Sequence, residues 1–152
     1  MDEQQYRRTY RELNRQRCVF EKGILARQLD CEFAERFCLA EREGVGCQSA
    51  AGLRQCEQAL ELLAENARFA LGMLAAPSAL PHARLMKLQV GGLRGIQAAT
   101  YAEDPEPKVD NIFGLLTAAR TRFTGLDGIP FDAVMPFVAG FKGRQHKRRE
   151  RD

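Results

Sequence analysis

Apolar residues recur at intervals of three and four along most of the chain, which is the spacing of an amphipathic helix. The clearest case is the stretch 49–75, where Ser49 is placed to cap the amino end of a helix. The apolar stripe of that helix consists of Leu53, Cys56, Leu60, Leu63, Ala67, Ala70 and Leu74. Comparable patterns predict further helices over 2–29, 31–43, 82–101, 111–123 and 131–141.

Glycine and proline punctuate this helical pattern. Gly23 is positioned to end or kink the first helix, and a glycine-rich turn at 44–46 separates the second from the third. Three glycines at 91, 92 and 95 interrupt the stretch 82–101, which indicates a break or close packing against a neighbour. No alternation long enough to build a sheet is present. The sequence therefore predicts an all-α fold, a compact bundle of five to six helices.

A chain of 152 residues suits one domain, and we expect a single helical domain over 1–140 followed by a basic C-terminal tail, 141–152. No run of about eighteen uncharged apolar residues exists to span a membrane. The first residues are polar and lack the apolar segment of a secretory signal. These features favour a cytoplasmic location.

The formal net charge of +3 is unevenly distributed. Residues 1–29 carry seven Lys and Arg against four Asp and Glu, and the tail 141–152 carries six against two. Basic ends of this kind bind nucleic acid or an acidic partner protein, or they are simply solvated. Nucleic acid is thus a possible partner through the tail.

The cysteines are the main candidate for chemistry. All five lie within 39 residues, and the following 96 residues contain none. The gaps between neighbours are twelve, six, eight and eight residues, wider than the two-to-four-residue gaps of zinc-finger knuckles. Three interpretations stay open: thiolate ligands of a metal, buried core residues, and a redox or disulfide switch. Wide spacing suits an iron–sulfur cluster better than a single zinc ion, although zinc remains an alternative.

A geometric prediction comes from the expected helices. Cys31 and Cys38 are seven residues apart, which places them on one face of the second helix. A helical hairpin would bring Cys56 level with them, and Cys47 would bend inward from the turn. We therefore predict Cys31, Cys38 and Cys47 as ligands, with Cys56 as the default fourth and Cys18 as its competitor.

The sequence gives little indication of any other catalytic or ligand-binding motif. The chain has two histidines, His82 and His146, and no metalloprotease motif. The "VGGLRG" stretch lacks the spacing of a dinucleotide or phosphate loop. The sequence does not assign an enzyme activity. It predicts a small helical iron–sulfur protein in electron transfer, redox sensing or an accessory subunit with a protein partner. The alternative is a metal-free helical adaptor that binds nucleic acid or an acidic protein through its basic ends.

Overall fold

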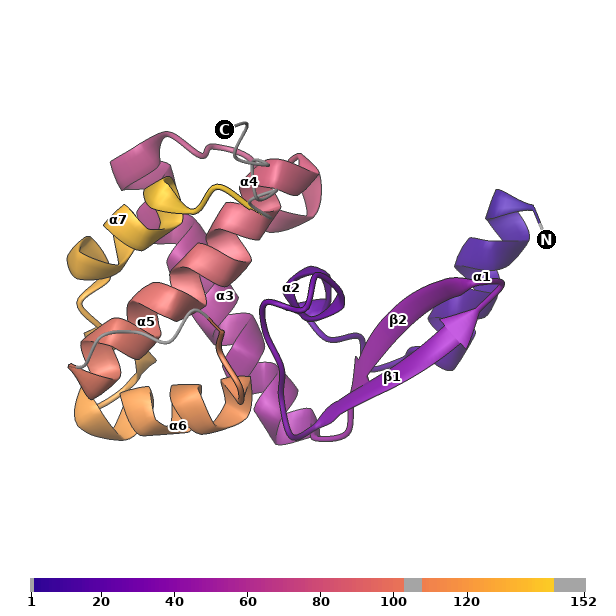
Figure 1. Cartoon of the computed structure of the whole chain (residues 1–152), viewed down its shortest axis with the longest axis horizontal. Coiled ribbons are helices and arrows are strands. Elements are labelled where there is room, and N and C mark those ends of the chain that lie inside the picture. The colour runs from indigo at the N-terminus through magenta and orange to yellow at the C-terminus, as the bar shows by residue number, and fades with distance from the viewer. Residues whose placement is uncertain (1, 103–107, 144–152) are drawn as a thin grey trace, which may run out of the picture.

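A computed structural model of the chain describes residues 2–102 and 108–143. Its larger part is a helical body (Figure 1). The helices of the body are α3 (Ala50–Leu71), α4 (His82–Met86), α5 (Gly92–Tyr101), α6 (Ile112–Arg122) and α7 (Phe131–Gly140). Short 3-10 turns at Pro77–Ala79 and Leu126–Gly128 join some of them.

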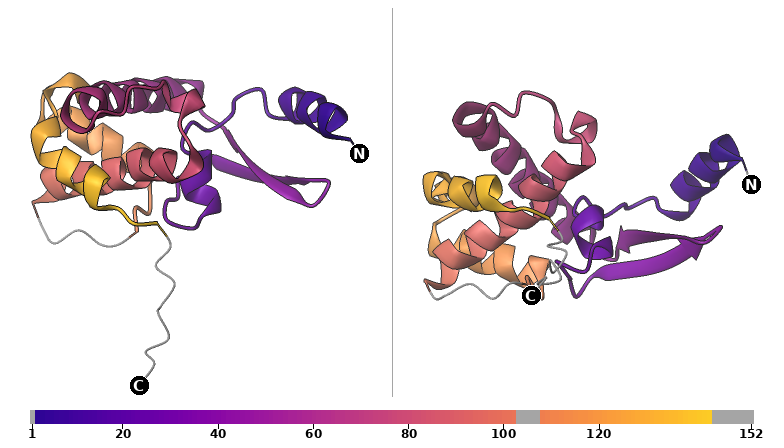
Figure 2. Two further views of the ribbon diagram at one scale, coloured as in Figure 1. Left: turned by 90° about the horizontal axis from the view of Figure 1, so that it is seen from above. Right: turned by 45° about the horizontal axis from the view of Figure 1, so that its top comes forward.

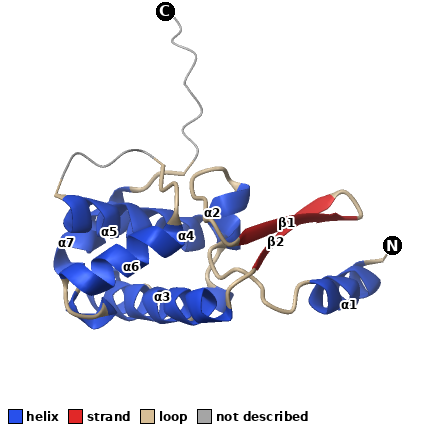
Figure 3. Cartoon of the chain, turned by 90° about the horizontal axis from the view of Figure 1, so that it is seen from below, coloured by secondary structure: helices blue, strands red, loops and turns tan. Residues whose placement is uncertain are grey.

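The smaller part is an N-terminal arm that extends from one end of the body (Figures 1 and 2). We define the arm as helix α1 (Glu3–Leu13) together with an antiparallel hairpin of β1 (Ala34–Leu39) and β2 (Arg42–Cys47). The short helix α2 (Glu21–Leu25) lies where the arm meets the body. The turn of the hairpin is at the end away from the body, and the chain leads from the base of β2 into α3 (Figure 3).

The apolar stripe predicted for α3 is confirmed only in part: Cys56, Leu63 and Ala67 are buried, Leu53 and Leu60 are half-buried, and Ala70 and Leu74 are exposed. Ser49 caps α3, since its hydroxyl accepts a hydrogen bond of 3.0 Å from the N–H of Gly52. Fully buried side chains from four of the helices form the core: Leu63, Leu93, Ile96, Leu116, Val134 and Val138. The structure confirms helices where the sequence predicts them over 49–75, 111–123 and 131–141, although their ends differ by a few residues.

The three glycines of the fourth predicted helix allow close packing rather than a break. A Cβ on Gly91 would lie 2.5 Å from the carbonyl oxygen of Phe137, and one on Gly95 would lie 2.8 Å from a methyl of Val134. Helix α5 therefore approaches α7 more closely than larger residues would allow. Helix α4 continues into α5 through a single π turn, Lys87–Gly91.

The π turn places a polar side chain in the interior. Gln89 is buried, and its amide accepts a hydrogen bond from the N–H of Gly23 and donates one to the carbonyl of Val19. These bonds, of 3.1 and 3.0 Å, fasten α2 to the body. Both polar atoms of a buried amide are thereby satisfied.

The prediction of an all-α bundle is wrong in one region, because residues 34–47 form a hairpin in a mostly helical protein. The expected helix over 31–43 is absent, and the turn falls at Ala40 and Glu41 instead of at the glycines. Both turn residues have positive φ, of 50° and 68°, as a two-residue hairpin turn of type I′ requires. Asn and Gly usually occupy such turns, so Ala-Glu gives no turn signal in the sequence.

The expected long first helix is also divided. Helix α1 ends at Leu13, and the chain then runs beside β2, with Arg17 bridged to Gly46. Helix α1 buries none of its residues in the body. It is held to the hairpin by Arg42, which lies over the ring of Tyr6 and bonds to the carboxylate of Glu3.

Within the described residues, no helix is long and apolar enough to cross a membrane. Most of the basic tail, residues 144–152, lies outside the described part, as does the linker 103–107.

Candidate metal centre

The base of the hairpin places Cys18 and Cys47 near each other. The N–H of Cys18 donates to the carbonyl of Val45 over 3.0 Å, and the N–H of Cys47 donates to the carbonyl of Gln16 over 2.7 Å. The segment 16–18 therefore behaves as a short third strand along β2. Pairing of this kind fixes both backbones, so the two cysteines hold a defined relation to each other.

Cys31 and Cys56 lie in two other segments, and both pack in or against the apolar core, as Cys18 does. Cys31 precedes β1 by three residues, and Ala34 at the start of that strand is paired with Cys47. Cys56 lies near the amino end of α3, nine residues after Cys47, on the face that packs into the core. Four separate segments of residues 18–56 thus supply one cysteine each.

Electrostatic coupling among these thiols supports their proximity. Burial is the main cause that raises the pKa of the Cys18 thiol to about 12, and negative charge on Cys31 and Cys47 makes a smaller contribution to that rise. Burial likewise raises the pKa of the Cys56 thiol, with added contributions from Cys18, Cys31 and Cys47. We call these four residues the four-thiol site. Its members disfavour one another as thiolates unless a positive charge compensates.

Cys38 is the cysteine that stands apart. It lies on β1 opposite Glu43, next to the turn of the hairpin, and its side chain is exposed. The premise that Cys31 and Cys38 share a helix face is wrong, because neither residue is in a helix. Cys38 also does not contribute to the raised pKa of Cys18 or Cys56. The structure thus separates Cys38 from the other four.

The premise for Cys47 is also corrected. The sequence suggests a flexible turn, whereas Cys47 is the last residue of a paired strand and its thiol donates to the carbonyl of Ser49 over 3.2 Å. All five cysteines are free thiols. In the described part of the chain, no three His, Cys, Asp or Glu side chains are arranged to hold a single metal ion.

A buried carboxylate lies next to the site, and the sequence does not reveal it. Glu21 accepts hydrogen bonds from the hydroxyl of Tyr10 and, over 2.8 Å, from the N–H of Val45, and it pairs with Arg17 at 3.2 Å. Burial and the bond to Glu21 raise the pKa of Tyr10 to about 12. Glu21 thus links α1, α2 and β2. A lone glutamate in a polar stretch carries no sequence signal for such a role.

One side of the four-thiol site borders an open groove of about 580 Å³. Cys18 and Val19 line it from the segment that precedes α2, and Leu53, Glu57 and Leu60 line it from α3. His82 does not belong to this groove but lines a different cavity, and His146 lies outside the described residues. The groove gives the site a route to solvent on the side of Cys18.

No protein-family model matches the chain, and comparisons with curated proteins and with solved structures likewise find no match. The four-thiol site is therefore the basis for assigning a function.

Proposed function

We propose that the protein holds an iron–sulfur cluster on Cys18, Cys31, Cys47 and Cys56. The proposal is supported by the position of Cys18 and Cys47 on paired backbones at the base of the hairpin, and by the contributions that the charges of Cys31 and Cys47 make to the raised pKa of Cys18 and Cys56. Thiolates are the preferred ligands of iron–sulfur clusters. Positive charge at the centre would offset the burial, and the smaller repulsion among the thiols, that raise the pKa of Cys18 and Cys56.

A cluster suits the spacing of these thiols better than a single ion. Four thiolates on one zinc ion must all come within about 2.3 Å of it. Among the described residues, no three ligand side chains are arranged to bind one ion. The four thiols are nevertheless close enough for the charge on the other three to contribute to the raised pKa of Cys56. In a four-iron cluster each thiolate binds its own iron, so the sulfurs stand farther apart.

The residues around the site have roles that fit this proposal. The strand pairing of Cys18 and Cys47 fixes two ligands before metal binds, and the fully buried Phe20 and Val45 help to exclude water on the core side. A bound cluster would supply one-electron chemistry. We propose electron transfer, redox sensing or an accessory role with a protein partner, in the cytoplasm, where thiols stay reduced.

Five single Cys→Ser variants, purified without oxygen, test this function. Iron and acid-labile sulfide are measured with the visible absorption spectrum of each. Serine at 18, 31, 47 or 56 should lower bound iron severely, because each removes one thiolate ligand. Cys38→Ser is the matched control and should keep the iron content and spectrum of the unmodified protein, since Cys38 is exposed and remote.

Several results would overturn the proposal. Anaerobic protein with neither iron nor sulfide would remove it, and zinc at one per chain without sulfide would replace the cluster by a structural ion. Loss of iron in Cys38→Ser would contradict the ligand set. Metal-free protein that binds nucleic acid with an affinity falling steeply with salt would favour the adaptor alternative.

A further inference from the structure

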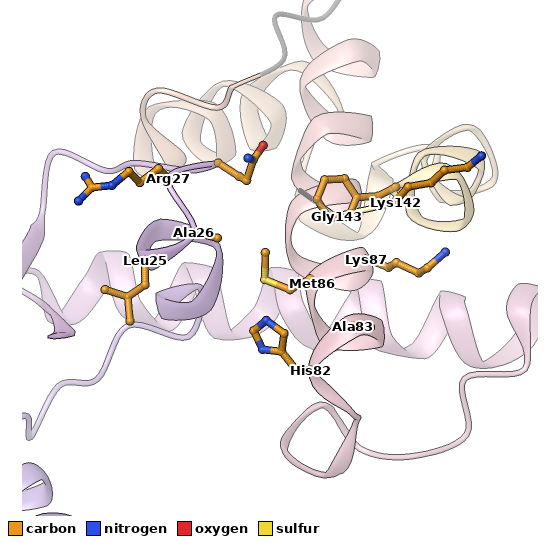
Figure 4. Close-up of a pocket in the computed structure, with 11 residues that line it drawn as sticks. Leu25, Ala26, Arg27, His82, Ala83, Met86, Lys87, Lys142 and Gly143 are labelled. Carbon is orange, nitrogen blue, oxygen red and sulfur yellow. The ribbon is translucent and has the colours of Figure 1, made fainter. Parts of the chain in front are cut away.

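Two adjoining cavities lie on the body, away from the groove beside Cys18. The first, of about 450 Å³, lies between the end of α2, the start of α4 and the residues that follow α7 (Figure 4). The second, of about 350 Å³, opens beside Arg94 of α5. Their linings share Gln28, Phe141, Lys142 and Gly143, so the two are neighbours.

The second cavity is lined by the guanidinium of Arg94, which has no carboxylate partner among residues 2–102 and 108–143. Arg94 is partly buried; its Nη2 donates to the Oε1 of Gln28 over 2.6 Å, and its guanidinium lies 5.1 Å from the ring centre of Phe141. Its Nε is buried and finds no acceptor in the part of the chain that the structure describes. Among the described residues, no carboxylate pairs with Arg94, and burial lowers its pKa. A desolvated cation without a counter-charge is unfavourable, so the guanidinium is suited to an anion.

The charge around both cavities has one sign. Neither lining includes an Asp or a Glu among the described residues. Lys142 lines both cavities, and Arg27, His82 and Lys87 line the first. Lys87 donates to the carbonyl of Ala139 over 3.1 Å, and it forms no ion pair with a carboxylate of the described residues. A surface of this kind attracts anions and gives them no repulsive neighbour.

The first cavity is apolar inside. Leu25, Ala26, Ala83, Met86 and Phe141 supply most of its wall. Figure 4 shows Met86 and His82 beside the central space near Ala26, whereas Arg27 and Lys142 extend outward at its margins. An apolar group would therefore contact the wall while a charged group remained at the edge toward Arg94.

We propose that these cavities bind a small amphiphilic anion, with a carboxylate or phosphate head on Arg94, Gln28 and Lys142 and a short apolar chain in the first cavity. Arginine binds either head group through two parallel hydrogen bonds. The proposal is independent of the four-thiol site, since none of the four cysteines lines either cavity.

Isothermal titration calorimetry with four probes tests the site. Octanoate and octyl phosphate carry both head and chain, octanol carries the chain alone, and inorganic phosphate carries the head alone. We expect the amphiphilic anions to bind about tenfold more tightly than octanol, which lacks the charge-assisted hydrogen bonds, and about tenfold more tightly than inorganic phosphate, which lacks the apolar chain. The stronger of the two amphiphiles identifies the head group. Equal binding of octanol, or no binding of either amphiphile, overturns the proposal.

Variants locate the two halves of the site. Arg94→Gln should weaken octanoate and octyl phosphate about tenfold, and Arg122→Gln, a guanidinium on another helix, should leave both unchanged. Ala83→Leu fills the apolar cavity from an exposed position. It should weaken octanoate and leave inorganic phosphate unaffected. An equal effect of Arg94→Gln and Arg122→Gln, or no effect of Ala83→Leu on octanoate, contradicts the assignment.

Discussion

The helical body and the N-terminal arm are stabilised in different ways. The body has a continuous apolar core, and none of its described residues forms an ion pair. Every ion pair of the described chain joins residues between Glu3 and Arg42, in the arm or at its junction with α2. An aromatic row of Tyr6, Tyr10 and Phe37 runs along the arm. The body depends on buried area, whereas the arm depends on a few specific contacts.

This difference has an energetic consequence. Burial of apolar surface is distributed over many side chains and tolerates salt. Exposed ion pairs contribute little and weaken with ionic strength. The arm should therefore open locally at a lower free energy than the body unfolds, unless metal at the four-thiol site fastens its base.

The largest effect is expected from a cavity in the body. Leu93→Ala removes a fully buried side chain of α5 and should lower the free energy of unfolding by about 2–5 kcal/mol. Urea denaturation measures the loss. Leu74→Ala is the control, because Leu74 is 75% exposed and should change little. A loss as large for Leu74→Ala would mean that burial does not distinguish the two positions.

A smaller effect is expected at the junction of arm and body. Glu21→Gln preserves size but removes the charge that Arg17, Tyr10 and the N–H of Val45 contact. The free energy of unfolding should fall by about 1–3 kcal/mol. Amide hydrogen exchange should accelerate at Cys18 and Val45 and stay unchanged in α5. The exposed Glu61→Gln is the control, and equal exchange in the two variants would argue against a link through Glu21.

The pH dependence of the metal-free protein should also report on this junction. Tyr10 and Cys18 lose a proton to become anions, and the fold raises each pKa to about 12, from ordinary values of 10.0 and 9.0. The folded chain therefore binds more protons than the unfolded chain in that range. Stability should be full below about pH 9 and fall as the pH rises toward 12. Denaturation midpoints between about pH 8 and 11 measure this, and Cys18→Ala should make the decline shallower. An unchanged midpoint over that range would contradict it.

The smallest effect is expected at the outer part of the arm. Arg42→Ala removes the exposed pair with Glu3 and the contact with the Tyr6 ring. Because both partners are exposed, global stability should change by at most about 1 kcal/mol. Nuclear magnetic resonance should show greater motion of α1 relative to the hairpin, with α3 unaffected. A rigid α1 in this variant would mean that other contacts hold it.

The same contrast explains what the sequence can predict. Helices such as α3 follow from a repeated apolar stripe and a capping serine, both of which are local signals. The hairpin does not, because "AERFCL" has no alternation of apolar and polar residues and its turn residues, Ala40 and Glu41, are good helix formers. Its pairing depends on contacts with the segment 16–18 and with Tyr10, which are distant in sequence.

The candidate site, too, can be predicted from the sequence only in part. The density of cysteines marks residues 18–56 as unusual, which composition alone reveals. Which thiols converge depends on strand register, and a register cannot be read from residues expected to form a helix. Cys38 is a natural partner of Cys31 in a helix, because seven residues return to one face, whereas along a strand they extend to the far end of the hairpin.

The π turn at Lys87–Gly91 acts like one extra residue inserted into a helix, because it changes the direction in which the preceding side chains point. Each residue of an α-helix advances by about 100°, so one additional residue in a turn rotates the preceding residues by that angle relative to the residues after the turn. The phase of α5 is set by the close approach of its glycines to α7. Deleting one residue from the turn would restore an ordinary helix and rotate α4 about its own axis. Gln89 would then face away from Gly23 and Val19, and His82 would turn out of the first cavity. The π turn thus determines how Gln89 and α4 face the segment around α2, which is distant from them in the sequence.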